Sequence, residues 1–319
     1  MKIHPPSARQ RGSIILAVFW IMAVMGMALV ASMRVVSYQT DVVNSQLDGL
    51  EALQYAERGV AVATHRSTKP WSTLLKQNFE DGGYEARIES EGGRFDINYI
   101  LTKPVPEEGT VDKLLLRQIF AEFGMDEQDQ AAVADALKDW VDPGDGEENR
   151  GAERQTYEEM GQPNFPFNRP FFSLEEMRLV KGMDIVESYN PNWRDWFTTF
   201  SVAGLNLADA EPRLVAVALQ TDLESLQKLE EEIAGADGIR ETEDDVRTVG
   251  AQFAIENLSP DVTENYVLHR VTSPQNGTNL VERIESTGFV GDIRRRIILI
   301  IQGRNNSPRI LDRREEFIQ

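Results

Sequence analysis

The feature that most constrains this chain is an uninterrupted apolar stretch near its N-terminus. Residues 13–33 contain neither a charged residue nor a proline. A helix needs about 20 apolar residues to cross about 30 Å of hydrocarbon. Lys2, Arg9 and Arg11 precede the stretch, and such a basic flank stays in the cytoplasm. We therefore expect a transmembrane helix over 13–33, with the rest of the chain across the membrane.

The helical pattern continues beyond the apolar stretch. No proline occurs from Arg34 to Arg66, and Lys69-Pro70 follows as a helix stop. The apolar positions of this segment keep helical spacing: Leu47, Leu50, Leu53, Ala56, Val60 and Ala63. We predict one continuous helix over 13–66, apolar all round in its first half and amphipathic in its second. A cleaved secretory signal has a core of only ~7–15 residues and gives no reason for such a continuation.

A basic leader, a glycine and a long helix in this order resemble the type IV pilin and pseudopilin family. In that family a prepilin peptidase cuts after the glycine, and the new N-terminus is methylated. Arg9-Gln10-Arg11-Gly12 followed by Ser13-Ile14-Ile15-Leu16 fits this pattern. The resemblance implies a leader over 1–12, cleavage between Gly12 and Ser13, and methylation of Ser13. A plain single-pass anchor that keeps its N-terminus is the alternative.

The fifth position of the mature chain departs from the usual family pattern. Most members carry glutamate there, whereas this chain has Ala17. A carboxylate in an apolar filament core is costly unless it is paired, and the family's glutamate is thought to meet the N-terminal amine of a neighbouring subunit. A subunit without it resembles one minor class, the K-type minor pseudopilins of type II secretion systems (general secretion pathway protein K).

Strand patterns flank a helical middle in the rest of the chain. Residues 84–88 and 95–99 alternate around Gly92-Gly93 and predict a β-hairpin. Alternation returns at 253–257 and 266–271 and, more weakly, at 281–289. The apolar run 296–301 predicts a buried strand. We expect 308–311 to add an edge strand, blunted by the charged residues 312–316.

Helical periodicity and capping residues define the middle. Helices are predicted over 111–123, with Gly124 after it, over 126–140 with Asp126 as N-cap, and over 211–233. Ser173-Leu174-Glu175-Glu176 is a capping box that opens a short helix ending near Gly182.

The predicted class is therefore α+β: a long N-terminal helix packed on an antiparallel sheet, with a large inserted α-helical domain. We assign 67–103 and 251–319 to the pilin-like part and 104–250 to the insert. K-type pseudopilins resemble this arrangement, and their insert is often called SAM-like.

Three stretches of the insert are similar to K-type family motifs. Leu137-Lys138-Asp139-Trp140-Val141-Asp142-Pro143-Gly144-Asp145, with Gly151-Ala152-Glu153 and Tyr157 after it, is the first. The second runs from Phe172 to Gly182. The third, Ser201 to Ala210, is less exact because Ala208 and Asp209 replace an asparagine and a threonine. With residues 9–16 these matches reach residue 219, whereas 220–250 matches poorly.

The acidic character of the chain points to cations. The net charge is −19, and loss of Lys2, Arg9 and Arg11 with the leader makes it −22. Such a chain repels nucleic acid, and with no cysteine it has neither disulfides nor thiolate sites. Calcium prefers clustered carboxylate oxygens, and the resemblance implies calcium in the insert, so we name Asp142, Asp145 and Glu153 as candidate ligands. A solvated acidic loop is the alternative, and for a second run at 237–245 it is the favoured interpretation.

No catalytic constellation stands out, so we expect no enzyme. His4, His65 and His269 lack metal-ligand spacing, and the chain has no nucleophile elbow or phosphate loop. Carboxylates are so numerous that pairs of them say little about acid–base catalysis. A membrane-anchored periplasmic hydrolase nevertheless stays open as an alternative. The turn at Val180-Lys181-Gly182 is similar to a helix-hairpin-helix, but Glu175 and Glu176 beside it favour protein packing over DNA.

The resemblance implies a role in protein export across the outer membrane. We expect a minor pseudopilin that caps the tip of the type II secretion pseudopilus and helps to initiate its assembly, with its C-terminal domain in the periplasm and a single pass through the bacterial inner membrane. The implied partners are the I- and J-type minor pseudopilins, the major pseudopilin, the prepilin peptidase and the inner-membrane secretion platform. A minor type IV pilin of a pilus or DNA-uptake machine is the other alternative.

Overall fold

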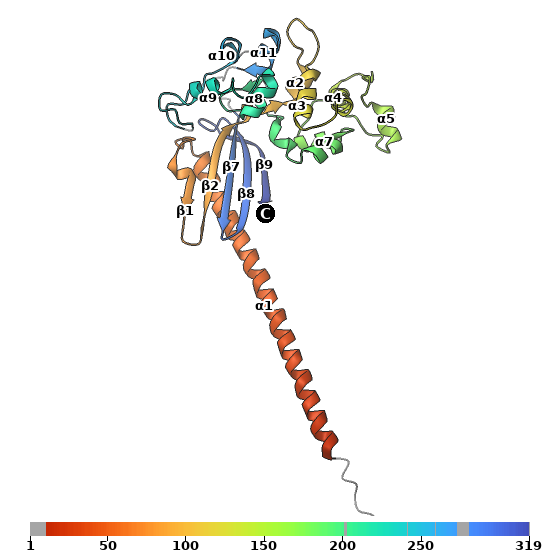
Figure 1. Cartoon of the computed structure of the whole chain (residues 1–319), viewed down its shortest axis with the longest axis vertical. Helices are drawn as coiled ribbons and strands as arrows, with labels where there is room; N and C mark the ends of the chain where they lie inside the picture. Colours follow the sequence, from red (N-terminus) through yellow and green to blue (C-terminus); the bar gives the residue numbers. More distant parts are fainter. Residues whose placement is uncertain (1–10, 201–202, 241, 259, 273–280, 319) are drawn as a thin grey trace, which may run out of the picture.

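The protein has a stem, a sheet and a helical domain, stacked in that order along its longest axis (Figure 1). In this computed structural model the described residues are 11–200, 203–240, 242–258, 260–272 and 281–318. The stem is α1 (Arg11–Thr64), a single helix of 54 residues. Its first part projects freely from the rest of the molecule, and its last part packs on the sheet (Figure 1). The predicted continuous helix is thus confirmed within these bounds.

Five antiparallel strands form the sheet, in the order β1-β2-β7-β8-β9. The strands are β1 (Lys76–Asn78), β2 (Gly82–Ser90), β7 (Val281–Val290), β8 (Ile293–Gln302) and β9 (Arg309–Ile318). The register places Ile88 beside Ile284 and Ile284 beside Leu299. Alternate residues of a strand share a face, so these three side chains lie in one row. They join Ala56 and Val60 of α1 in a small hydrophobic core.

Small residues let α1 lie close to the sheet. Gly288 of β7 lies directly under the helix, and a Cβ built on it would be 1.9 Å from the carbonyl oxygen of Ala52. The end of the helix is also fixed, because the guanidinium Nη1 of Arg304 donates to the carbonyl oxygens of Ala63, His65 and Thr68 at 3.0–3.2 Å. Ala63 lies in the last turn of α1, where carbonyl groups lack partners within the helix, and His65 and Thr68 follow directly after the helix. Arg304 therefore fixes the stem to the head.

The helical domain occupies the chain between β2 and β7. Its helices are α2 (Ile97–Thr102), α3 (Lys113–Glu122), α4 (Glu127–Val141), α5 (Arg154–Glu159), α6 (Leu174–Met177), α7 (Met183–Tyr189), α8 (Pro212–Leu219), α9 (Gln227–Ile233), α10 (Ala251–Asn257) and α11 (Glu264–Arg270). Short 3-10 turns η1 (Thr73–Leu75), η2 (Glu91–Gly93) and η3 (Trp193–Trp196) and two-residue strands β3 (Phe95–Asp96), β4 (Phe197–Thr198), β5 (Leu205–Asn206) and β6 (Val271–Thr272) complete the set. A second, larger hydrophobic core lies among these elements and is centred on residues such as Trp140, Phe120 and Trp193.

Local capping explains where the central helices begin. The carboxylate of Asp126 accepts from the backbone nitrogens of Gln128 and Asp129, as predicted for the N-cap of α4. Asp112 caps α3 by accepting from the backbone nitrogen of Leu115. Asp112 also binds Arg270 of α11 through a fully buried ion pair of 2.6 Å. The end of the helical block is therefore joined to its beginning.

The predicted hairpin and two of the predicted strands are wrong. Residues 97–102 form α2, because Asp96 caps that helix and Ile97, Ile100 and Leu101 bury one helical face. β2 pairs instead with β7, more than 190 residues later in the chain. Residues 251–257 and 264–270 form α10 and α11, whose apolar residues pack in the larger core. Short segments can satisfy both periods, and here tertiary packing selected the helical one.

Two smaller expectations are also corrected. The helix predicted over 211–233 is interrupted, since Gln220 adopts a left-handed conformation with φ of 50° and ends α8. The edge strand is longer than expected: β9 includes residues 312–316, the charged residues that we expected to blunt its edge. Its charges are paired with neighbours, as in the ion pairs of Arg313 with Glu57 and of Arg296 with Glu316. The strands predicted at 281–289 and 296–301 are confirmed as β7 and β8, and so is the α+β class.

Candidate functional site

The exposed part of α1 is the first candidate functional surface. Every residue from Ile14 to Leu47 is exposed, including Ala17. The helix is long and apolar enough to cross a membrane, as a single-pass anchor requires. Gly12 and Ser13 lie in its first turn, whereas leader residues 1–10 lie outside the described residues. Cleavage and methylation at Gly12 and Ser13 stay predictions.

An apolar stripe continues along α1 up to the head. Val43, Leu47 and Leu50 are 51–58% exposed. At 100° per residue they lie on the side of the helix opposite Ala52 and Ala56, which are buried against the sheet. We call these three residues the outer stripe. One side of α1 is thus used by the sheet of its own chain, and the other side presents leucine and valine to solvent.

The predicted calcium ligands lie around the loop between α4 and α5. Asp142 ends α4; its carboxylate accepts from the backbone nitrogen of Gly144 at 3.1 Å and pairs with Lys138 at 3.2 Å. Asp145 is exposed on the loop. Glu153, which immediately precedes α5, is only 4% exposed, and neither of its carboxylate oxygens has a hydrogen-bond partner. Burial, reinforced by the charges of Asp139, Asp145 and Asp142, raises the pKa of Glu153 to about 7.

A buried carboxylate with two oxygens lacking partners fits a cation. Unpaired buried charge is unfavourable, and a bound ion removes that cost. Among the described residues, however, no three carboxylate or imidazole groups are already arranged as a metal site. The donor set of Glu153, Asp145 and Asp142 is made of hard oxygens, which calcium prefers. The three residues named from the sequence therefore lie in one region, but the loop would have to bring Asp145 inward.

Asp139 is the residue of this region that sequence reasoning did not single out. It is fully buried, and its carboxylate accepts from the backbone nitrogens of Ala152 at 2.9 Å and Glu148 at 3.2 Å. Burial raises its pKa to about 6. Its signal in the sequence was available: Asp139 lies on the apolar face of a predicted helix, between Leu137 and Trp140, where a charged side chain needs a specific partner.

The second acidic run is organised by its own backbone. The Oδ2 atom of Asp244 accepts from the backbone nitrogens of Ala236 and Asp237 at 2.8 and 3.0 Å. These hydrogen bonds lower the pKa of Asp244 together with the hydroxyl of Thr242, which is the largest cause. These contacts close the described part of the run into a loop, and residue 241 lies outside the described residues. A solvated loop without calcium stays a prediction here.

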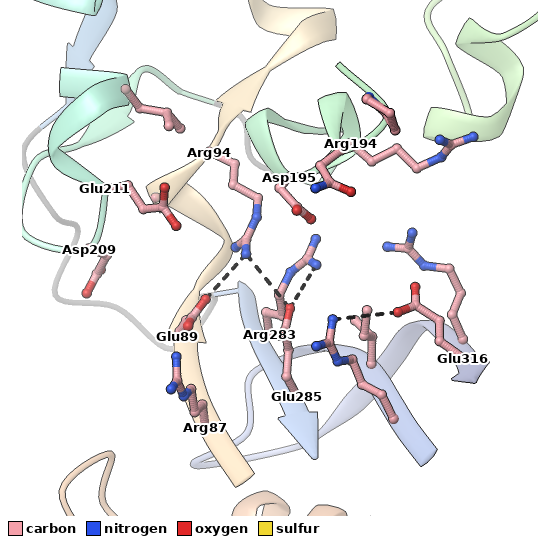
Figure 2. Close-up of a pocket in the computed structure, with 17 residues that line it drawn as sticks. Arg87, Glu89, Arg94, Arg194, Asp195, Asp209, Glu211, Arg283, Glu285 and Glu316 are labelled. Atoms are coloured by element: carbon pink, nitrogen blue, oxygen red, sulfur yellow. Dashed lines mark hydrogen bonds and ion pairs between the residues drawn. The ribbon is translucent and has the colours of Figure 1, made fainter. Parts of the chain in front are cut away.

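A charged cleft separates the sheet from the helical domain. It has a volume of about 420 Å³ and is lined by arginines and carboxylates in equal number. Figure 2 shows Arg94 directed at Glu89 and Glu285, at 3.3 and 3.9 Å, and Arg283 directed at Glu285 at 3.2 Å. Arg283 also binds Glu91 at 2.9 Å. Both members of that pair are buried, so these charges join the sheet to the start of the helical domain.

His269 has no metal-ligand partner among the described residues. It is buried in the helical domain, with its ring stacked on Tyr99 at 4.9 Å between centroids. Burial lowers its pKa. His65 lies just after the end of α1 and accepts from the backbone nitrogen of Ser67. His4 lies outside the described residues.

Comparison with known proteins finds one family that resembles part of this chain. The family model described as "Type II secretion system (T2SS), protein K" matches residues 93–190. Type II secretion system protein K of Pseudomonas aeruginosa is 32% identical over 104 residues, which are 32% of this chain and 31% of that protein. The protein of the same name from Klebsiella pneumoniae is 29% identical over 195 residues, 55% of this chain and 59% of that protein. Over these residues the chain is similar to the type II secretion system protein K family.

The solved structure of a relative shows the same fold. A chain of the GspK–GspI–GspJ complex from the type 2 secretion system of enterotoxigenic Escherichia coli superposes with a TM-score of 0.58 at 16% identity. The similarity covers 88% of this chain and 99% of that chain. The sequence matches, in contrast, span 31% and 59% of the two K-family relatives. The family model covers α2 to α7 and includes the loop with Asp142, Asp145 and Glu153.

Proposed function

We propose that this chain is a minor pseudopilin that caps the tip of the type II secretion pseudopilus and helps to initiate its assembly for protein export. The observation that carries the proposal is the exposed stem: the part of α1 from Ile14 to Met33 has no charged residue, is exposed on all sides and projects from the head as an isolated helix. Such a surface is stable only in lipid or against other apolar helices. A subunit that moves from the inner membrane into a helical filament core satisfies both conditions, with the head in the periplasm.

The position of the helical domain supports a capping role. It lies at the end of the head opposite to the free part of the stem (Figure 1). A further subunit placed above this chain would have to occupy the space that this domain fills. Ala17 agrees with a terminal position, because the chain lacks the carboxylate that pairs with a neighbouring N-terminus in most of the pilin family.

The partners that we propose are the I- and J-type minor pseudopilins, with the major pseudopilin below them. The relative of the same fold was solved in a complex with GspI and GspJ, and the outer stripe gives a parallel partner helix an apolar face. The prepilin peptidase and the inner-membrane secretion platform would act on the chain before and during assembly.

Exchange of outer-stripe residues tests the partner proposal. Leu47→Arg and Leu50→Arg change side chains that are 57% and 58% exposed, so the fold should survive. We expect the double variant to lose co-purification with the I- and J-type partners, because two charges would be buried against an apolar helix. Leu223→Arg is the matched control, since Leu223 is 60% exposed but lies in the helical domain. Equal recovery of both partners by all variants would contradict the proposal.

Gold labelling of the head tests the capping proposal. In pseudopili assembled with tagged chain, label should lie at filament ends. Label along the sides would indicate an ordinary filament subunit, as in the alternative of a minor type IV pilin. Hydrolytic activity that disappears in Asp142→Asn or Glu153→Gln would instead favour the periplasmic hydrolase.

We also propose that the loop after α4 binds calcium through Glu153, Asp145 and Asp142. The support is the buried carboxylate of Glu153, whose two oxygens have no partner. A bound ion would neutralise it and connect α4 to α5. Titration calorimetry on chelator-treated protein should detect calcium binding in the wild type and in Glu158→Gln, which changes an exposed carboxylate nearby on α5. Binding that is undiminished in Glu153→Gln would contradict the assignment.

A further inference from the structure

We propose that Asp139 is a positioning residue that holds the loop after α4 in its metal-binding shape. The inference rests on the proposed calcium site and adds a residue to it that does not itself ligate the ion. Asp139 lies inside the loop, whereas the three proposed ligands lie on it. The proposal therefore separates the carboxylates of this region into two roles.

The hydrogen bonds of Asp139 direct its carboxylate at the backbone of the loop. Oδ2 accepts from the backbone nitrogens of Ala152 and Glu148, and Oδ1 also lies 3.2 Å from the latter nitrogen. Ala152 directly precedes Glu153, so Asp139 fixes the backbone beside the orphaned carboxylate. A side chain on a regular helix is held more firmly than one on a loop. The backbone of Glu148, nine residues after Asp139, is thereby also bound to α4.

Gly151 lets the loop lie close to the carboxylate of Asp139. A Cβ built on Gly151 would lie 1.8 Å from Oδ2 of Asp139 and 2.7 Å from its Cγ. Gly151 does not have a positive φ, so alanine would be acceptable to the backbone and is excluded only by the carboxylate. The Nζ atom of Lys181 also donates to the carbonyl oxygen of Gly151 at 3.2 Å. The loop is thus closed around Asp139 by a contact that only glycine allows.

The ammonium group of Lys113 holds the same part of the loop from a second side. Lys113 of α3 binds Glu148 at 3.0 Å and Asp135 of α4 at 2.7 Å. Asp142 and Asp145 lie on the part of the loop between these fixed points. Partners that orient metal ligands typically contribute 10–100-fold in metal affinity. We expect an effect of this size from Asp139, with no change in the number of ligands.

Two variants disturb Asp139 by different routes. Gly151→Ala displaces its carboxylate while every acidic residue is kept, and Asp139→Asn removes the charge while one acceptor oxygen is kept. Asp129→Asn is the control, because it removes one carboxylate from the first turn of the same helix. All are made in the full chain in detergent. Calcium affinity is measured by calorimetry, and Tb³⁺ replaces calcium to count its bound waters from luminescence lifetimes.

We expect Kd for calcium to rise about 10–100-fold in Gly151→Ala, and about 10-fold in Asp139→Asn, and to stay unchanged in Asp129→Asn. The number of waters on Tb³⁺ should stay the same in every variant. In chelator, amides 144–152 should exchange faster in the two variants than in the wild type, because the loop is loosened before the metal binds.

Three results would overturn the proposal. An unchanged Kd in Gly151→Ala means that the shape of the loop does not matter. An additional water on Tb³⁺ in Asp139→Asn means that Asp139 is a ligand. Both results leave the calcium site itself intact. If the wild type binds neither ion, the calcium proposal fails and this inference fails with it.

Discussion

The contact between Gly288 and α1 gives a demanding test of how the stem is attached to the head. In Gly288→Ala the new Cβ would lie 1.9 Å from the carbonyl oxygen of Ala52 and 2.4 Å from the backbone nitrogen of Ala56. Contacts to a Cβ below 3.0 Å do not occur, so helix and strand must separate by more than about 1 Å. Both contacted groups are backbone atoms of α1, so a change of side-chain rotamer cannot relieve the clash.

The expected loss of stability follows from the buried residues that would be exposed if α1 moved away from the sheet. Ala52, Ala56 and Ile284 are all fully buried at this contact. Overpacking of a core by one methyl group costs about 1–3 kcal/mol, and here a whole helix–sheet interface moves with it. We therefore expect a loss of about 3 kcal/mol in the opening free energy of the sheet. The helical domain has its own core and should be little affected.

Hydrogen exchange of the full chain in detergent measures both parts at once. Amides of β7 and β8 should lose protection in Gly288→Ala, whereas those of α3 and α4 should keep it. Gly49→Ala is the control, because Gly49 lies on the same helix and has no heavy atom within 4 Å of its built Cβ. Alanine there should stabilise the helix by up to about 1 kcal/mol. A loss below about 0.5 kcal/mol in Gly288→Ala would refute the close approach.

Three further predictions concern the ion pair between Arg283 and Glu91, the loop after α4, and Ala17 in the exposed part of α1. Arg283→Met leaves the buried Glu91 with Arg94, at 4.0 Å, and the hydroxyl of Thr198, and it should cost about 3–5 kcal/mol in urea unfolding. The added change Glu91→Gln should recover part of the loss in a double-mutant cycle. In chelator, stability should fall between pH 4.5 and about 7, because Glu153 keeps its proton to about pH 7 in the folded protein whereas its ordinary pKa is 4.5. The Glu153→Gln variant should flatten this fall by about 2–4 kcal/mol, and parallel pH curves for the two proteins would contradict the assignment. Ala17→Glu should reduce tip assembly and secretion, measured by export of a reporter, because it puts an unpaired carboxylate into an apolar environment; normal secretion would count against the role given to Ala17.

Patterns that depend on neighbours in the sequence were predictable. The long helix, the caps of α3 and α4 and the strands β7 and β8 follow from periodicity and capping residues within a few positions. Where two periods competed, as at 251–270, the sequence could not decide. The residues there are helical because their apolar side chains pack in the larger core. Arg270, at the end of α11, also binds Asp112, the N-cap of α3, 158 positions earlier in the chain.

The candidate calcium site was also predictable only in part from the sequence. Clustered carboxylates identified Asp142, Asp145 and Glu153 as a group, but their count could not say which of them is buried without a partner. Asp139 has its role because the loop folds back over α4 and closes on it through Gly151. The charged cleft between the sheet and the helical domain could not be predicted either, because the ion pair beside it joins Arg283 and Glu91, which are 192 positions apart.

The sequence by itself determined that this chain has an apolar helix long enough to cross a membrane, two kinds of secondary structure and an acidic loop. Hydrophobicity, periodicity and charge are properties of short segments. The tertiary structure decided how β2 finds β7, which side of α1 stays exposed, and which carboxylate lacks a partner. These are consequences of burial, and burial depends on which distant segments cover a residue.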